Sequence, residues 1–221
     1  MTTGSKRIFI LIGLCIGLVI TVQAQPQNQE KGNTQPQNAK KKVSWIRTGD
    51  DHVNEYSVWA GYAFDSMELW GKTPEATLGI LGVRYNRKIL NIYNTTLEYT
   101  LDINLYAHYT YPEFTIERNK NSITGAGFSP LGFQFNFLNN NRLQPFLETS
   151  GGFMFLSQPF PDWRGERVNF TFGAGGGLEY MAASFLSLTL GYRYFHLSNG
   201  ETGLVNPGID SGFVYFGITF F

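Results

Sequence analysis

Three side chains near the C-terminus have the types and the spacing that a nucleophilic hydrolase needs. His196 and Ser198 stand two residues apart, and Asp210 follows twelve residues after the serine. In such a set, the imidazole takes the proton of the hydroxyl as it attacks, and the carboxylate fixes the tautomer of the imidazole. The chemistry requires an element that holds all three within reach of one another.

Two neighbouring strands would do this. Residues 185–198 and 208–221 both alternate in polarity, which predicts two antiparallel strands joined by the connection 199–207. Residues two apart on a strand share a face, so His196 and Ser198 lie together, and Asp210 on the returning strand can lie beside His196.

The face that these residues share is apolar. His196 and Ser198 continue the series Leu186, Leu188, Leu190, Tyr192 and Tyr194, and Asp210 has the parity of Val214, Phe216, Ile218 and Phe220. Polar groups that face hydrocarbon are costly and usually functional, which points to a lipid substrate. The alternative is a place in the interfacial rim, where polar residues are ordinary.

The rest of the chain predicts an all-β fold, an antiparallel transmembrane β-barrel of about eight strands. The alternation alone also fits a soluble sandwich, but the connections alternate in length as in membrane barrels. Longer connections are expected at 65–75, 107–121, 157–167 and 199–207, and shorter ones at 87–91, 138–142 and 181–184. The predicted strands are 55–64, 76–86, 92–106, 122–137, 143–156, 168–180, 185–198 and 208–221.

The first 54 residues read as targeting and spacer segments. A basic start, an apolar run from Ile8 to Ile20 and the small residues of Val22-Gln23-Ala24 predict a signal peptide over 1–24. Residues 25–54 are expected to be a disordered periplasmic leader, ahead of a barrel over 55–221. The one cysteine, Cys15, lies in the signal peptide, so the mature chain has neither disulfides nor thiolate metal sites.

Composition and two further motifs narrow the function. The 17 basic and 17 acidic residues balance, which argues against nucleic acid as the main partner. The run Gly173 to Gly177 lies in an alternating strand with no helix after it, so small residues filling a narrow lumen are expected there rather than a phosphate loop. His52 and His108 have no evident partner and are expected to be exposed.

The C-terminal motif resembles the lipid A 3-O-deacylase family of outer-membrane enzymes. The resemblance rests on His196-x-Ser198-Asn199, on Asn206-Pro207-Gly208-Ile209-Asp210 and on the terminal aromatic strand, over roughly the last thirty residues. It implies an eight-stranded barrel, catalytic roles for His196 and Ser198, and an oxyanion role for Asn199. The family's acid is typically Glu, whereas Asp210 stands here, and its shorter side chain requires closely spaced strands.

The leading hypothesis is therefore an outer-membrane esterase that removes an ester-linked acyl chain from lipid A, the lipid part of lipopolysaccharide in the outer leaflet. Ser198 would be the nucleophile, His196 the base, Asp210 the orienting acid and Asn199 an oxyanion donor, with no metal or organic cofactor. The alternative is a non-enzymatic structural or adhesion barrel. A channel is disfavoured, because side chains fill the interior of a barrel with eight strands.

Overall fold

The computed structural model describes residues 53–113 and 119–221. The predicted signal peptide and almost all of the predicted leader lie outside these residues and stay predictions. The first strand begins at Asn54, one residue before the expected start of the barrel. No helix in the described part of the chain is long and apolar enough to cross a membrane.

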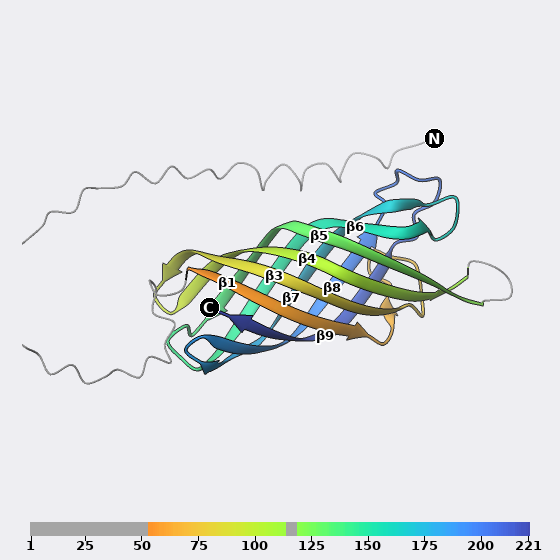
Figure 1. The fold of residues 1–221 in the computed structure, drawn as a ribbon. Helices are drawn as coiled ribbons and strands as arrows, with labels where there is room; N and C mark the ends of the chain where they lie inside the picture. The colour runs from red at the N-terminus through yellow and green to blue at the C-terminus, as the bar shows by residue number, and fades with distance from the viewer. Residues whose placement is uncertain (1–52, 114–118) are drawn as a thin grey trace, which may run out of the picture. The chain divides into compact units, whose positions relative to one another are not determined.

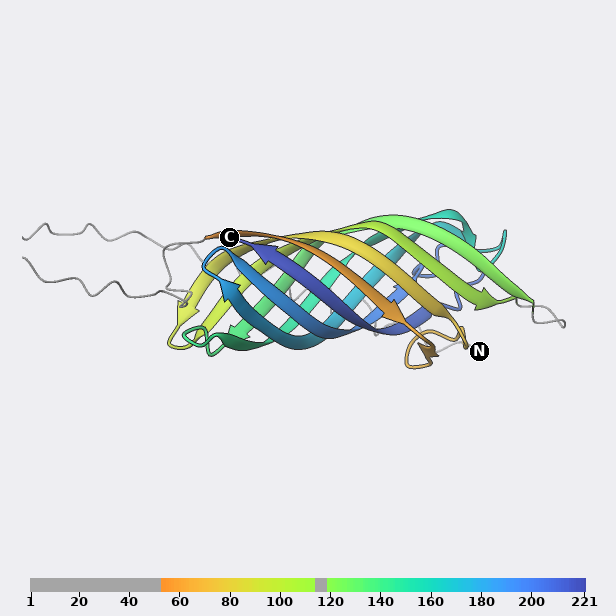
Figure 2. The same cartoon turned by 60° about the horizontal axis from the view of Figure 1, so that its bottom comes forward.

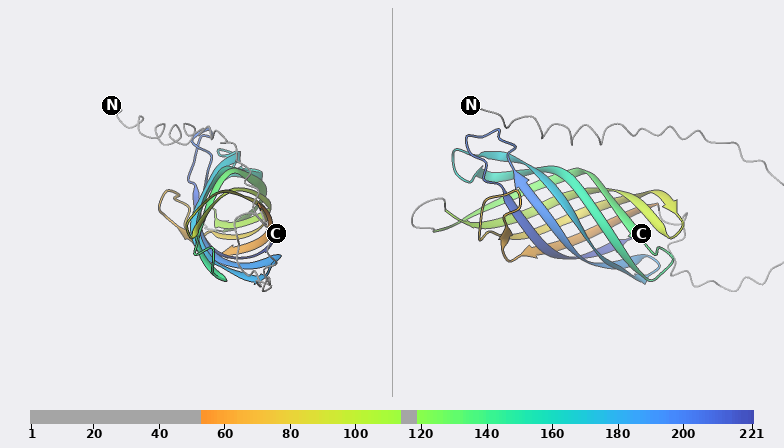
Figure 3. Two further views of the ribbon diagram at one scale, coloured as in Figure 1. Left: turned by 90° about the vertical axis from the view of Figure 1, so that its left-hand side faces the viewer. Right: turned by 180° about the vertical axis from the view of Figure 1, so that it is seen from behind.

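Eight long strands form one closed antiparallel ring, as predicted (Figure 1). Each strand pairs with the next along the chain, and β1 pairs with β9 over Tyr56–Phe220 to Tyr62–Val214, which closes the ring. Figure 2 shows β1 and β9 side by side, and the end-on view of Figure 3 shows the closed ring. The ring strands are β1 (Asn54–Ala63), β3 (Thr77–Ile92), β4 (Thr95–Pro112), β5 (Lys120–Phe137), β6 (Leu143–Phe160), β7 (Glu166–Ala183), β8 (Leu186–Ser198) and β9 (Ile209–Phe220).

The connections 93–94, 138–142 and 184–185 lie at one end of the barrel, which we call the turn end. The connections 64–76, 113–119, 161–165 and 199–208 lie at the other end, which we call the loop end. Three of these four are longer than every connection at the turn end, as expected, but the connection predicted at 157–167 spans only 161–165, because β6 continues to Phe160, and it is no longer than 138–142. In barrels of this kind, the longer connections face the outside of the cell.

Several strands run further than their alternation indicated, and bulges explain the difference. Strand β4 continues to Pro112 instead of ending at 106, and its pairing with β5 shifts register between Asn104 and Ala107. A bulge adds one residue and reverses which parity faces outward, so the regular alternation in the sequence is interrupted there. His108 therefore lies in β4 rather than in a loop, and it is half-buried rather than exposed.

The outer face of the ring is apolar, whereas the inner face is largely polar. On β9, for example, Val214, Phe216 and Phe220 are each about half exposed, and the intervening Thr219 is buried. A soluble sandwich would bury the apolar set instead. This inverted arrangement is that of a barrel whose outer wall contacts lipid.

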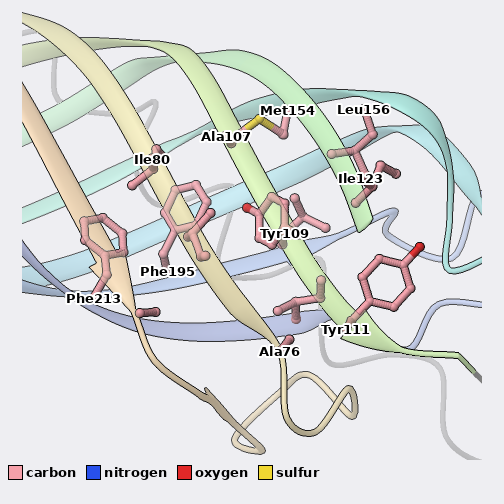
Figure 4. Packing of buried hydrophobic residues seen from close by; sticks show 14 of the residues in the cluster. Ala76, Ile80, Ala107, Tyr109, Tyr111, Ile123, Met154, Leu156, Phe195 and Phe213 are labelled. Atoms are coloured by element: carbon pink, nitrogen blue, oxygen red, sulfur yellow. The ribbon is translucent and has the colours of Figure 1, made fainter. Parts of the chain in front are cut away.

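The interior is filled by side chains in two zones. Near the loop end, a cluster of buried aromatic and aliphatic residues crosses the lumen, as Figure 4 shows for Tyr109, Ile123, Phe195 and Phe213. Below it, four charged residues form what we call the lumen charge cluster: Arg84, Asp102, Glu148 and Arg193.

The glycine run lies in the wall of this filled lumen, as predicted. A Cβ on Gly173 would stand 2.7 Å from the Ser150 hydroxyl oxygen, and one on Gly175 would stand 2.9 Å from the Cα of Arg193. Glycine at these two positions therefore lets β7 approach the Ser150 side chain and the main chain of β8 closely.

Candidate functional site

The pairing of β8 with β9 places His196 directly opposite Asp210. The two side chains are joined by a bond of 2.6 Å between His196 Nδ1 and Asp210 Oδ1. An ionised carboxylate only accepts hydrogen bonds, so this contact puts the proton of a neutral imidazole on Nδ1 and leaves Nε2 free to accept. The shorter aspartate therefore reaches the histidine, because the two residues face each other in register.

The connection between β1 and β3 covers Asp210 from outside. We call residues 64–76 the strap; Figure 3 shows it in orange beside the ring of strands. Asp210 Oδ2 accepts three backbone N–H groups from the strap, at 2.8 Å from Leu69, 2.6 Å from Trp70 and 2.8 Å from Gly71. Asp210 thus lies on the outward side of β9, as its parity predicted, yet its exposed fraction is 0%.

The strap is anchored to β9 and to the connection before it. Its two-residue strand β2 (Ser66–Met67) pairs with Ser211 and Asp210. The buried Thr73 hydroxyl donates to the Gly208 carbonyl at 2.6 Å, and the N–H of Lys72 donates to the Pro207 carbonyl at 2.6 Å. These bonds hold the three amides of residues 69–71 against the carboxylate.

Ser198 lies on the same side of β8 as His196, at the loop end of the strand. Positions two apart on a strand are separated by about 6.5 Å along the backbone, so the serine and histidine side chains are neighbours. Within the described residues, the Ser198 hydroxyl makes no side-chain hydrogen bond. The structure therefore joins His196 to Asp210 directly. Ser198 lies beside them but makes no hydrogen bond to the imidazole of His196.

Asn199 is 1% exposed, and its side chain points into its own connection. Its Nδ2 donates to the Val205 carbonyl at 2.8 Å, and its Oδ1 accepts the N–H of Glu201 at 2.9 Å. Its backbone N–H donates to Asn206 Oδ1 at 3.0 Å. Asn199 shapes the loop after the serine, and its oxyanion role stays a prediction.

Aromatic rings enclose the histidine on two sides. The Trp70 ring stands edge-on to His196, with centroids 5.5 Å apart, and also contacts Phe172 at 5.5 Å. On β7, Phe172 pairs with His196 and Phe170 pairs with Ser198 in register. The site is thus an outward-facing polar set in an apolar, aromatic surround.

Two sets of hydrogen-bond donors at this site were not predicted from the sequence: the backbone amides of the strap and the Tyr194 hydroxyl. The strap acts through backbone N–H groups, which leave no mark in the residue types. Tyr194, whose hydroxyl donates to Asp210 Oδ1 at 2.8 Å, was read only as a member of the apolar series. Its position two residues before His196 on the same face was the available signal.

Among the described residues, no group of three or more His, Cys, Asp and Glu side chains could hold a metal ion. The His196–Asp210 pair has the geometry of a base held by an acid. Together with a neighbouring hydroxyl, it can perform acyl transfer.

Comparisons with known proteins identify the family and the fold of this chain. The family model described as lipid A 3-O-deacylase (PagL) matches residues 79–219. That range contains β8, the loop after it and β9 except for its last residue, Phe220. No curated protein matches the chain.

Solved structures show the same fold. A crystal structure of the outer membrane enzyme PagL superposes with a TM-score of 0.55 at 18% identity, covering 73% of this chain and 97% of that one. The crystal structure of Neisserial surface protein A (NspA) gives 0.50 at 15% identity, covering 76% and 97%. The family match and these outer-membrane neighbours place the chain in the bacterial outer membrane.

Proposed function

Because this chain belongs to the lipid A 3-O-deacylase (PagL) family, we propose that it hydrolyses an ester-linked acyl chain of lipid A with Ser198, His196 and Asp210 as its catalytic residues. The family supports the substrate and the class of reaction. One observation carries the residue roles: the 2.6 Å bond between His196 Nδ1 and Asp210 Oδ1, two residues from a serine on the same face.

The reaction proceeds through an acyl-enzyme. Ser198 Oγ attacks the ester carbonyl carbon while His196 Nε2 takes the hydroxyl proton, giving a tetrahedral oxyanion. The bond between the former carbonyl carbon and the sugar oxygen breaks, and the imidazolium gives its proton to that departing oxygen, which leaves as a sugar hydroxyl. Water then attacks the acyl-serine with His196 as base, which releases a fatty acid and restores Ser198.

Asp210 orients His196 throughout these steps. Its bond to Nδ1 keeps the lone pair of Nε2 directed away from the carboxylate, and its charge stabilises the imidazolium. The oxyanion needs donors of its own. Asn199 is the candidate from the sequence, but its Nδ2 group is buried in its own connection and bonded to Val205, so it would have to turn toward Ser198 to serve as a donor.

The direction of the site suits a membrane lipid. His196 and Ser198 face outward on β8, and their register partners Phe172 and Phe170 are 38% and 46% exposed. An acyl chain in the outer leaflet can lie along these rings while its ester reaches the serine. A water-filled lumen is not needed for access.

The first test is mass spectrometry of purified lipid A incubated with the detergent-folded protein. We expect loss of one acyl chain with the native protein and no loss with Ser198→Ala or His196→Ala. The spectrum also identifies the acyl position that is cleaved.

His108→Ala is the matched control. His108 also faces outward near the loop end, with Thr110 two residues later, but its register partners Gly79 and Thr124 offer no carboxylate. This variant should keep full activity. Intact lipid A after incubation with the folded native protein would contradict the proposal and favour a structural or adhesion barrel.

A further inference from the structure

We propose that residues 69–71 of the strap are the positioning element of this enzyme, a backbone clamp that fixes the Asp210 carboxylate for His196. The inference rests on the proposed function. It adds to the site a segment more than a hundred residues away in sequence, which acts through its main chain.

The two carboxylate oxygens of Asp210 have different hydrogen-bond donors. Oδ2 accepts only the three strap amides, whereas Oδ1 accepts His196 Nδ1 and the Tyr194 hydroxyl. With Oδ2 held by the strap, the carboxylate cannot rotate without breaking several bonds at once. Oδ1 is therefore presented to the imidazole in one fixed orientation.

All of these donors other than the histidine are neutral. Within the described residues, no lysine or arginine forms an ion pair with Asp210. A cation there would compete with the imidazolium for the charge of the carboxylate, whereas amide dipoles hold the anion and leave His196 as its ionic partner. The clamp thus orients the Asp210 carboxylate while leaving its negative charge unneutralised by any other residue than His196.

Gly71 is the residue that allows the strap to come this close. A Cβ added there would stand 2.9 Å from the backbone nitrogen of Asp210, 3.0 Å from the carbonyl carbon of Gly208 and 3.0 Å from that of Ile209. All three atoms belong to the main chain, so the neighbours cannot move aside and the strap must lift instead. An alanine at position 71 would therefore draw the N–H groups away from Oδ2.

The clamp also fits the length of aspartate. The strap is fixed to β9 by the β2 pairing and by the Thr73–Gly208 bond, so the distance between its amides and the β9 backbone is set. A glutamate at position 210 carries one more methylene, so its carboxylate would be too far from the β9 backbone to fit against the strap amides. The common acid of the family is thus expected to be a poor substitute in this chain.

The test measures kcat and KM for lipid A hydrolysis by three single variants of the detergent-folded protein. Gly71→Ala and Asp210→Glu should each lower kcat by about tenfold to a hundredfold, the range expected when hydrogen bonds to a charged group are lost. KM should change little in both. Gly79→Ala is the matched control, because the nearest atom to a Cβ there is 3.7 Å away.

A double variant separates positioning from a general loss of structure. If Gly71 acts through Asp210, then Gly71→Ala combined with Asp210→Asn should be no slower than Asp210→Asn alone. Additive losses would overturn the proposal, as would native kcat in both Gly71→Ala and Asp210→Glu.

Amide hydrogen exchange in the ¹⁵N-labelled protein supplies a readout that does not depend on activity. The amides of residues 69–71 should exchange slowly in the native protein and rapidly in Asp210→Asn. Rapid exchange in the native protein would overturn the clamp, even if lipid A is hydrolysed. Slow exchange in a protein that leaves lipid A intact would overturn the proposed function, and with it the catalytic purpose of the clamp.

Discussion

Glu148 inside the barrel and Asp210 on its outer side are both buried carboxylates, but their partners differ in kind. Glu148 is bonded to two arginines and a tyrosine: Arg84 Nη1 lies 2.6 Å and Arg193 Nη2 2.8 Å from its Oε2, and the Tyr215 hydroxyl donates to its Oε1 at 2.8 Å. Asp210 receives three backbone amides, a tyrosine hydroxyl and a histidine.

This difference separates a carboxylate that stabilises the fold, Glu148, from one that is placed to assist a reaction, Asp210. In the lumen charge cluster, carboxylates and permanently charged guanidinium groups neutralise one another. At Asp210 the neutral donors fix the geometry, while the one ionic partner is a histidine, which can take up a proton. The first arrangement fills a lumen, and the second is suited to catalysis.

The largest effect on catalysis should come from removing the charge of Asp210 on the outer side of the barrel. Asp210→Asn leaves the shape of the site but favours the wrong imidazole tautomer, and we expect kcat to fall by about 10²–10⁴-fold. Stability should change far less than activity. Parallel measurements of hydrolysis and of unfolding in denaturant test this, and a near-native kcat would remove Asp210 from the mechanism.

Removing the inner charge should have the opposite signature. Glu148→Gln leaves two buried arginines with one carboxylate and should reduce the free energy of unfolding by roughly 3–5 kcal/mol. The kcat of the remaining folded protein should stay near native. Equilibrium unfolding with Glu201→Gln, an exposed control, makes the comparison, and a loss of kcat without a loss of stability would contradict the structural role.

A smaller effect should appear in substrate binding. Trp70 is 62% exposed and lies against His196 and Phe172, so Trp70→Ala removes apolar surface where the acyl chain is proposed to lie. We expect KM to rise roughly tenfold, with a modest change in kcat. Trp163→Ala, at a tryptophan that is 79% exposed on another connection, should leave KM unchanged.

The smallest effect is expected at an exposed ion pair. The hydrogen bond from Arg164 lowers the pKa of the Asp162 carboxyl in the connection 161–165. A lowered folded-state pKa adds stability above the unfolded pKa, and this is lost as pH falls through the folded value. Because solvent screens the pair, Asp162→Asn should barely change stability at pH 7. A large loss in the same unfolding assay would show that exposed pairs also matter here.

The sequence predicted the parts of this molecule that depend on alternation. Parity placed His196 and Ser198 on one side of their strand, and the loop length placed Asp210 opposite the histidine, as the register shows. Strand ends were missed where bulges reverse the parity, as in β3 between Lys88 and Leu90, and in β4. The local pattern cannot reveal a bulge, because the partner strand determines it.

The strap could not be predicted from the sequence, for a different reason. Its contribution is made by main-chain amides, which every residue except proline carries. Only Gly71 is distinctive, and one glycine in a connection has many explanations. The contact arises because ring closure brings the first connection beside the last strand, which is a property of the whole topology.

That closure also determines when the enzyme can become active. The amides that hold Asp210 come from the first connection, whereas Asp210 and His196, the proposed acid and base, come from the last two strands, and β1 and β9 pair only when the ring is complete. A chain in transit, or one caught partway through insertion, therefore has the catalytic residue types but no assembled centre. On the proposed mechanism, hydrolysis is therefore confined to the finished barrel, which lies in the membrane that holds the proposed lipid substrate.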